Sequence, residues 1–224
     1  MRGLSCVIPA YNEAPRIAAV LQSVIGHPAI DEVIVVDDGS SDATAEIVAG
    51  IAGARLIRMA QNAGKSRAVA TGIEAAQGDL ILLLDSDLIG LSGADLNALI
   101  APVRAGRADV AISLRGNAPG LWRAIGLDYI SGERVVSKAL LGPIEALRRL
   151  PRFGLEVYMN RRILAAGARI AVVRWPGVAS PWKAAKRGRL AGVKADLKML
   201  SDMFHTITPV QAVAQIWAMR RLRA

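Results

Sequence analysis

The feature that most constrains the fold is an alternation of short apolar runs with segments of helical periodicity through the first half of the chain. The apolar runs are rich in Val, Ile and Leu, which is typical of buried parallel strands. Because strands that alternate with helices form parallel sheets, we expect an α/β fold with a mostly parallel sheet flanked by helices on both faces. The strands are predicted at 5–9, 32–37, 55–59, 80–84 and 109–114, and the helices at 17–24, 42–48, 66–76 and 96–103.

The second half is less regular and is predicted to be largely helical. Thr208 and Pro209 are expected to begin the last helix, and Asp42 is expected to cap the second one. We interpret residues 1–115 and 116–224 as two halves of one continuous domain, because no low-complexity linker separates them. The second half is predicted to contain a loop at 116–120, helices over 121–150, 155–167, 186–205 and 209–222, and a returning strand at 169–174.

The net charge of +9 at pH 7 is concentrated in the C-terminal part of the chain. Two interpretations stay open for segment 183–198: a solvated helix face, or a site for an anionic acceptor or an anionic membrane surface. The apolar side of the last helix is predicted to pack on the domain, with membrane contact as the alternative. A nucleic-acid-binding module is excluded, since interleaved aromatic residues and a recognisable motif are both lacking. The basic segment holds Lys183, Lys186, Arg187, Arg189, Lys194 and Lys198 against Asp196, and the last helix carries Val210, Val213, Ile216 and Trp217.

The cysteine content and the chain start bear on location. Cys6 is the only cysteine, so no internal disulfide can form, and its place in the first strand predicts a buried, inert thiol. We see neither a signal-peptide pattern nor an apolar stretch long enough to cross a bilayer. We therefore expect a cytoplasmic protein. Peripheral contact with the inner face of the membrane and a homodimer are left open.

Polar residues follow each of the first four predicted strands. Ligands of open α/β sheets bind at the carboxyl ends of the strands, and these ends lie at one edge. Turn building alone explains any one of these clusters, but a structural sheet has no need of all four. The clusters contain Pro9, Tyr11, Asn12 and Glu13, then Asp37 to Ser41, then Asn62, Gly64 and Lys65, and finally Asp85, Ser86 and Asp87.

Two of these clusters carry the clearest chemistry. Asp85 and Asp87 directly follow a buried strand, so both carboxylates can approach one Mg²⁺ or Mn²⁺ ion, which prefers oxygen ligands. Lys65 opens a helix after a glycine and can reach a phosphate or a nucleotide base. A P-loop is excluded because Met59 stands where its first glycine is required, and the first strand lacks the glycines of a dinucleotide-binding turn.

Four motifs occur in order over residues 4–115. They are VIPAYNE at 7–13, VVDDGSSD at 35–42, NAGK at 62–65 and DSD at 85–87. In order and spacing they resemble the family 2 glycosyltransferases. The resemblance implies a Rossmann-like GT-A fold, a nucleotide-diphosphate sugar donor, and Mg²⁺ or Mn²⁺ at the Asp-x-Asp. By the family pattern, the nucleotide pocket and its metal are contacted by Pro9, Tyr11, Glu13, Asp38, Lys65 and Asp85, with Asp87 as the most direct metal ligand.

The second half resembles the family less completely. Segments 131–134 (SGER) and 154–156 (GLE) are similar to acceptor-side motifs of bacterial members, including those similar to glucosyl-3-phosphoglycerate synthases. The resemblance implies that Glu156 lies near the transferred sugar, so Glu156 and Asp87 are the candidate catalytic residues. From the residues alone, Glu156 could also be a helix N-terminal charge, and Glu133 has the same two interpretations. Such members often carry a metal-binding His where this chain has Ser180, which leaves the third metal ligand open.

We therefore expect an enzyme, a metal-dependent hexosyltransferase that transfers a sugar from a nucleotide-diphosphate sugar to a small or lipid-linked acceptor that carries negative charge. UDP-glucose is the expected donor. One alternative is an enzyme similar to the polyprenyl-phosphate sugar transferases that uses GDP-mannose. The other is a catalytically silent protein that binds nucleotide sugars.

Overall fold

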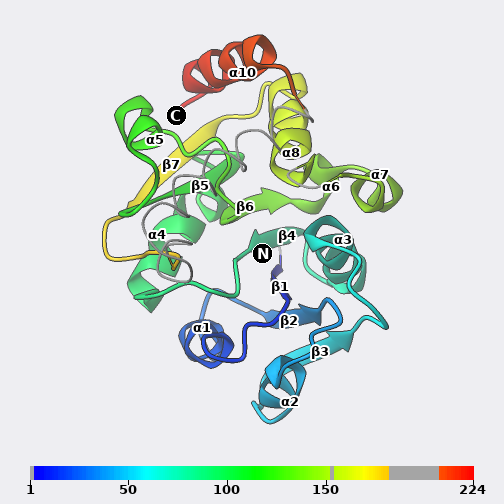
Figure 1. The fold of residues 1–224 in the computed structure, drawn as a ribbon. Helices are drawn as coiled ribbons and strands as arrows, with labels where there is room; N and C mark the ends of the chain where they lie inside the picture. The colour runs from blue at the N-terminus through cyan, green and yellow to red at the C-terminus, as the bar shows by residue number, and fades with distance from the viewer. Residues whose placement is uncertain (1–2, 152–153, 182–206) are drawn as a thin grey trace.

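A computed structural model describes residues 3–151, 154–181 and 207–224. Its centre is a seven-stranded sheet of β1 (Leu4–Ala10), β2 (Glu32–Asp37), β3 (Ala54–Arg58), β4 (Leu80–Leu83), β5 (Val110–Arg115), β6 (Arg134–Ser137) and β7 (Ile170–Trp175). The strands lie in the order β3-β2-β1-β4-β6-β5-β7 (Figure 1). Within this sheet β6 runs antiparallel to both neighbours, and the other strands are parallel to one another. The sheet is mostly parallel, as predicted.

Helices cover both faces of the sheet. Because successive side chains of a strand point to opposite faces, each strand contributes to two apolar cores. In β1, Cys6 and Ile8 belong to one apolar core, whereas Val7 belongs to the other. The first core is covered by α1 (Ile17–Val24), α2 (Thr44–Ala49) and α4 (Gly93–Arg104). Figure 1 shows α1 and α4 on one side of the sheet, with α3, α7 and α8 on the other. The second core is covered by α3 (Lys65–Ala75), α5 (Gly120–Ile125), α6 (Lys138–Leu141), α7 (Ile144–Arg148), α8 (Gly154–Ala165) and α10 (Pro209–Arg221).

The predicted elements of the first half are confirmed, apart from the cap of α2. The residue at the N-cap position is Ala43, which makes no side-chain capping bond. Asp42 precedes it, and its carboxylate accepts hydrogen bonds from the backbone N–H and the hydroxyl of Thr44 and from the Ala14 N–H. Asp42 therefore ties the start of α2 to the loop after β1. Cys6 is buried as predicted, and burial raises the pKa of its thiol.

The helix predicted over 121–150 is wrong. This segment contains α5, the strand β6, and the two short helices α6 and α7. Gly126 ends α5 in the left-handed conformation, and Gly142 and Pro143 separate α6 from α7. Between these breaks, Arg134 to Ser137 inserts between β4 and β5 and pairs with both. Strands from both halves of the chain therefore share one sheet.

The last helix begins as predicted, but the face predicted to pack is wrong. Thr208 and Gln211 form a capping box at its start. However, Val210, Val213 and Trp217 are 80%, 54% and 58% exposed. The buried residues of α10 are Ala212 and Met219, and Ile216 is half-buried against the second core.

Two predictions fall on residues that the structure does not describe, and a third concerns membrane-spanning helices. The helix over 186–205 and the basic segment 183–198 both lie outside the described residues. Within the described residues, no helix combines the length and apolar character needed to cross a membrane.

Candidate active site

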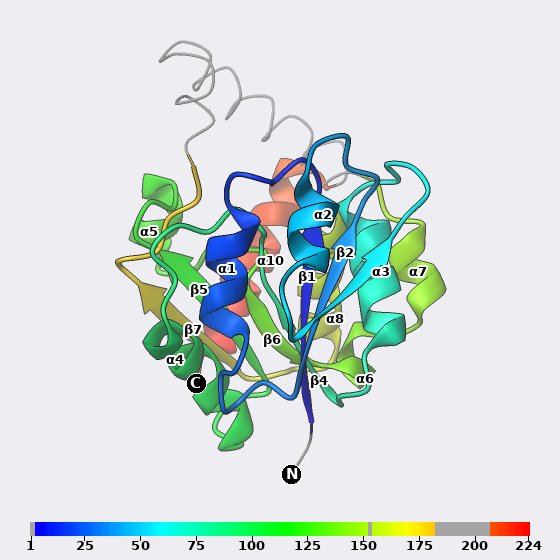
Figure 2. The same cartoon turned by 90° about the horizontal axis from the view of Figure 1, so that it is seen from below.

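The carboxyl ends of β1, β2 and β4 meet the N-terminus of α3 at one edge of the sheet. In Figure 2 the chain enters β1 from the bottom, so this edge lies at the top of the view. A pocket of about 250 Å³ opens here. It brings together every residue that the sequence assigned to the donor and the metal, from four separate segments of the chain. Its lining comprises Pro9, Ala10, Tyr11, Glu13, Asp38, Lys65, Ala68, Asp85, Ser86 and Asp87.

Lys65 links the two predicted halves of the site. Its Nζ atom lies 2.8 Å from Asp85 Oδ1 and 3.1 Å from Glu156 Oε1. Burial by itself would lower the pKa of Lys65, but the two carboxylates raise it above its ordinary value. Burial likewise opposes ionisation of Asp85, yet Lys65 and Arg115 hold the pKa of that carboxyl below its usual range. The ammonium therefore stays charged and bridges Asp85, which follows β4, to Glu156 of α8.

Asp38 holds the loop that delivers Lys65. Its carboxylate is 3% exposed and accepts hydrogen bonds from the backbone N–H groups of Ala63 and Gly64, both at 2.8 Å. The neighbouring Gly39 adopts a φ of +69°, and a Cβ atom there would lie 2.6 Å from the Asn62 nitrogen. The turn after β2 and the loop before α3 are thus packed backbone to backbone. Asp38 lines the pocket and also fixes the start of α3.

The carboxyl of Asp87, the predicted metal ligand, lies close to other acidic side chains. Burial raises the pKa of its carboxyl, and the carboxylates of Asp85 and Glu13 raise it further. This repulsion between carboxylates is what a divalent cation relieves. Among residues 3–151, 154–181 and 207–224, no three His, Cys, Asp or Glu side chains are grouped to hold a metal by themselves. The donor set therefore fits Mg²⁺ or Mn²⁺ that takes its remaining oxygens from phosphate and water.

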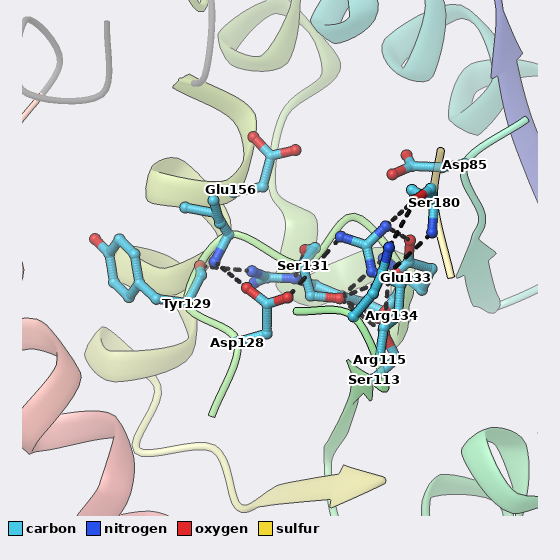
Figure 3. Close-up of polar contacts among 12 residues, drawn as sticks. Asp85, Ser113, Arg115, Asp128, Tyr129, Ser131, Glu133, Arg134, Glu156 and Ser180 are labelled. Atoms are coloured by element: carbon cyan, nitrogen blue, oxygen red, sulfur yellow. Dashed lines mark hydrogen bonds and ion pairs between the residues drawn. The ribbon is translucent and has the colours of Figure 1, made fainter. Parts of the chain in front are cut away.

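Behind the pocket lies a cluster of buried charged residues on β5, β6 and the segment between α5 and β6 (Figure 3). Arg115 Nη1 lies 3.4 Å from Glu133 Oε1, and Arg115 Nη2 lies 4.0 Å from Asp128 Oδ2. Glu133 Oε2 also accepts hydrogen bonds from Ser113 at 2.6 Å and Ser131 at 2.9 Å. Burial raises the pKa of Glu133 despite the opposing charge of Arg115. Burial raises the pKa of Asp128 to about 6.

Backbone contacts join this cluster to the pocket. A Cβ atom at Gly132 would lie 2.6 Å from Asp85 Oδ1 and 2.8 Å from Lys65 Nζ, so the SGER segment packs directly against the ion pair. Arg134 holds the segment from below, through the Ser131 carbonyl at 2.8 Å and Asn160 of α8 at 2.6 Å. A side chain at position 132 would therefore displace the Lys65–Asp85 pair.

Ser180, which stands where the family pattern often has a metal-binding His, belongs to the buried cluster. Its hydroxyl accepts a hydrogen bond from Arg115, and its carbonyl accepts one from the Asn117 amide at 2.7 Å. Arg115 and Asp128 were not singled out from the sequence. The rule that located the pocket could have found Arg115, because it ends β5 at the same edge of the sheet.

A wider hollow of about 490 Å³ lies at the opposite edge of the sheet, lined by residues that include Leu80, Arg104 and Asp109. Arg104 and Asp109 are already engaged with Asp31 and Arg169. None of the predicted site residues lines this hollow. We therefore take the smaller pocket as the candidate active site, because the predicted metal ligands and the charged donor-site residues line it.

Comparisons with known proteins identify the family of the chain. The family model described as Glycosyl transferase family 2 matches residues 5–155. Among curated proteins, a dolichyl-phosphate beta-glucosyltransferase of Trichomonas vaginalis is 40% identical over 36% of this chain and 28% of that protein. A glucosyl-3-phosphoglycerate synthase of Mycolicibacterium paratuberculosis is 35% identical over 47% of this chain and 34% of that protein. The chain thus spans about a third of the length of the curated relatives it matches.

Solved structures extend the likeness over most of the chain. Glucosyl-3-phosphoglycerate synthase from Mycobacterium tuberculosis, in complex with phosphoglyceric acid, gives a TM-score of 0.70 at 26% identity over 92% of this chain and 80% of that chain. The same protein in complex with Mn²⁺, UDP-glucose and phosphoglyceric acid gives 0.68 at 25% identity over 92% and 79%. The predicted GT-A fold is confirmed.

Proposed function

Because the chain belongs to glycosyl transferase family 2, we propose that it transfers a sugar from a nucleotide-diphosphate sugar to an acceptor that carries a phosphate. The observation that carries this proposal is the pocket at the carboxyl edge of the sheet. The Lys65 ammonium and four carboxylates, drawn from four segments of the chain, line it, which suits a ligand with a diphosphate and a metal. UDP-glucose is the proposed donor, and its support is the Mn²⁺ and UDP-glucose bound by a similar solved protein.

We assign donor binding to the segments around β1, β2 and α3. Tyr11 is 47% exposed beside the pocket and offers a ring face to the nucleotide base. Lys65 offers a positive charge to the diphosphate. Asp38 acts both as a pocket residue and as the anchor of the Lys65 loop, through Ala63 and Gly64.

Asp87 and Asp85 would hold the divalent cation, as Mg²⁺ or Mn²⁺. When bound, the cation neutralises charge on the leaving nucleotide diphosphate. Asp87 is the more available ligand, because Asp85 is engaged with Lys65. Burial, and then the carboxylates of Asp85 and Glu13, raise the pKa of the Asp87 carboxyl, and a bound cation would relieve the repulsion between these carboxylates.

Glu156 is proposed to act on the acceptor side. It is the third residue of α8 and is 6% exposed, with its Oε1 atom held 3.1 Å from Lys65. The carboxylate can accept a hydrogen bond from a hydroxyl of the acceptor or of the transferred sugar. The phosphate on the proposed acceptor is supported by the relatives, whose names contain dolichyl phosphate and 3-phosphoglycerate.

A peripheral membrane contact is proposed for α10. Its exposed face carries Val210, Val213 and Trp217, and Arg220 stacks on Trp217 with 5.2 Å to the ring centroid. Pro209 to Arg221 contains no acidic residue. Tryptophan flanked by arginine suits the headgroup region of an anionic bilayer. Trp217→Ala should reduce co-sedimentation with anionic vesicles, and equal binding by this variant and wild type would reject the contact.

The test of the proposed function is a nucleotide-release assay with Mn²⁺ across donors and acceptors. We expect UDP release from UDP-glucose that depends on a phosphorylated acceptor and is lost in excess chelator. In Glu156→Gln, UDP binding should survive while transfer falls, and Glu145→Gln is the matched control, because the Glu145 side chain on α7 is exposed. GDP release from GDP-mannose with polyprenyl phosphate would instead support the alternative enzyme. UDP binding without transfer to any acceptor would support a silent binding protein.

A further inference from the structure

The Lys65 ammonium lies where a metal cation bound to Asp85 could also lie. It lies 2.8 Å from Asp85 Oδ1 and 3.1 Å from Glu156 Oε1, between the two carboxylates. Among the described residues that line the pocket, Lys65 is the one basic side chain, against the four acids Glu13, Asp38, Asp85 and Asp87. Asp85 therefore has a positive partner in the protein without ligands. A divalent cation that approaches Asp85 meets the charge of Lys65 as well.

The Lys65–Asp85 pair is packed on the side of Gly132 and is accessible on the side of the pocket. On one side the backbone at Gly132 packs against both members, because even a Cβ atom there would approach Asp85 and Lys65 to within 3 Å. The backbone before Lys65 is held by Asp38 through the N–H groups of Ala63 and Gly64. The Lys65 side chain, by contrast, is 41% exposed toward the pocket and has a flexible stem. The ammonium can thus leave Asp85 by moving into the pocket while the loop keeps its hydrogen bonds to Asp38.

We propose that Lys65 acts as an internal cation that competes with the divalent metal for Asp85, so that the metal binds tightly only after a nucleotide diphosphate has drawn Lys65 away. This inference rests on the proposed function, because it takes a nucleotide diphosphate as the ligand of the pocket. When Lys65 leaves the carboxylate of Asp85, the diphosphate becomes its new negatively charged partner. Metal and nucleotide then raise each other's affinity by the same factor, as linkage requires.

One substitution is expected to change ligand affinity in an unusual direction. Removing a basic residue from a nucleotide site normally weakens ligand binding. Here Lys65→Met should strengthen binding of Mn²⁺ in the absence of nucleotide, by about tenfold, because Asp85 is released and one positive charge is removed. The same variant should show a smaller gain in Mn²⁺ affinity on addition of UDP than wild type shows.

The experiment is a titration with Mn²⁺ alone, followed by calorimetry and by the paramagnetic resonance signal of free Mn²⁺, with and without saturating UDP. Lys65→Arg keeps the charge and should bind Mn²⁺ like wild type. Lys138→Met is the matched control, since Lys138 donates to the Ala76 carbonyl at the opposite edge of the sheet. It should leave Mn²⁺ affinity unchanged. Circular dichroism checks folding, and Lys65→Gln replaces Lys65→Met if the latter is unfolded.

The outcomes separate this inference from the proposed function. Tighter Mn²⁺ binding in the neutral Lys65 variants alone supports the competition. Equal Mn²⁺ affinity of wild type and Lys65→Met without nucleotide overturns it, even if UDP and metal still bind and the enzyme is active. Absence of Mn²⁺ binding to every variant, with UDP present, overturns both the competition and the metal-dependent function.

Discussion

The pocket and the buried cluster behind it are built from the same kinds of residues in opposite surroundings. In the pocket, the side chains of Lys65 and Asp85 are 41% and 25% exposed. In the cluster, Asp128 and Glu133 are 1% and 0% exposed, and the Arg115 side chain is 15% exposed. The pocket is lined by four carboxylates and one ammonium group, and the side chains of Asp85 and Asp87 are only partly buried. In the cluster, the carboxylates of Asp128 and Glu133 face the Arg115 guanidinium, and two serine hydroxyls donate hydrogen bonds to Glu133.

This difference in burial separates charged residues that are available to a ligand from charged residues that stabilise the fold. Charges in contact with water can exchange partners at small cost, so a metal or phosphate can replace a side chain. Buried charges have lost their hydration, and removing one partner leaves the other uncompensated. We therefore expect substitutions in the pocket to change activity, and substitutions in the cluster to change stability.

The largest effect is expected for Asp87→Ala in the pocket. Loss of the most available metal ligand should lower kcat/KM by a factor on the order of 10³–10⁴. The free energy of unfolding should stay the same or rise, because burial and then repulsion from Asp85 and Glu13 raise the pKa of the Asp87 carboxyl and disfavour its charged form. Nucleotide release and urea unfolding measure the two quantities. Wild-type activity in this variant would remove Asp87 from the metal site.

The next largest effect is expected for Arg115→Met in the cluster. The substitution leaves Glu133 and Asp128 buried without their guanidinium partner. A broken buried pair costs about 3–5 kcal/mol, so urea unfolding should shift by that amount. Affinity of the folded protein for UDP should stay close to wild type. Unchanged stability with lost UDP binding would reverse the comparison and make Arg115 a donor-site residue.

A pH-dependent effect is expected from Asp128. Its pKa of about 6 in the folded state exceeds its unfolded value of about 4, because burial disfavours the charged form. The folded protein therefore binds this proton more tightly, and the stability from Asp128 falls as the pH rises from about 4 to 6. Relative to Asp128→Asn, wild type should lose about 3 kcal/mol of unfolding free energy between pH 4 and 7.

Urea unfolding of both proteins at several pH values measures this difference. Asp109→Asn is the control, because Arg169 holds the pKa of the exposed Asp109 below its usual range. Stability from Asp109 is present above its unfolded pKa and is lost as the pH falls, which is the opposite sign. A constant difference between wild type and Asp128→Asn across the range would show that Asp128 does not titrate there.

The smallest effect is expected for nucleotide binding. Asp38→Ala and Lys65→Ala should each weaken UDP binding without metal by about 1.5–3 kcal/mol, the value of a lost charged hydrogen bond. Calorimetry measures the affinities. Asp38→Ala should also destabilise the start of α3, since the Ala63 and Gly64 N–H groups lose their acceptor. If both variants keep wild-type affinity for UDP, the pocket is not the nucleotide site.

Much of the fold was determined by local patterns in the sequence. The alternation of strands and helices over residues 1–115 was correct, since buried strands and amphipathic helices have different apolar periods. The same patterns located the pocket, because the polar residues after parallel strands necessarily meet at one edge. Membership of the family followed from the order of four motifs. The roles of the individual pocket residues stay predictions.

The tertiary structure decided what depends on distant partners. Strand β6 is short, and its backbone N–H and C=O groups find their hydrogen-bond partners on β4 and β5, which are distant in sequence. The local sequence therefore suggested a helix. Lys65 meets Glu156 across 91 positions of sequence, which no local pattern predicts. Helix α10 has apolar residues on both sides, and Ala212 with Met219 is buried in place of Val210 and Trp217. Which side is buried depends on the surface beneath the helix, because burial removes from water whichever apolar groups that surface can contact.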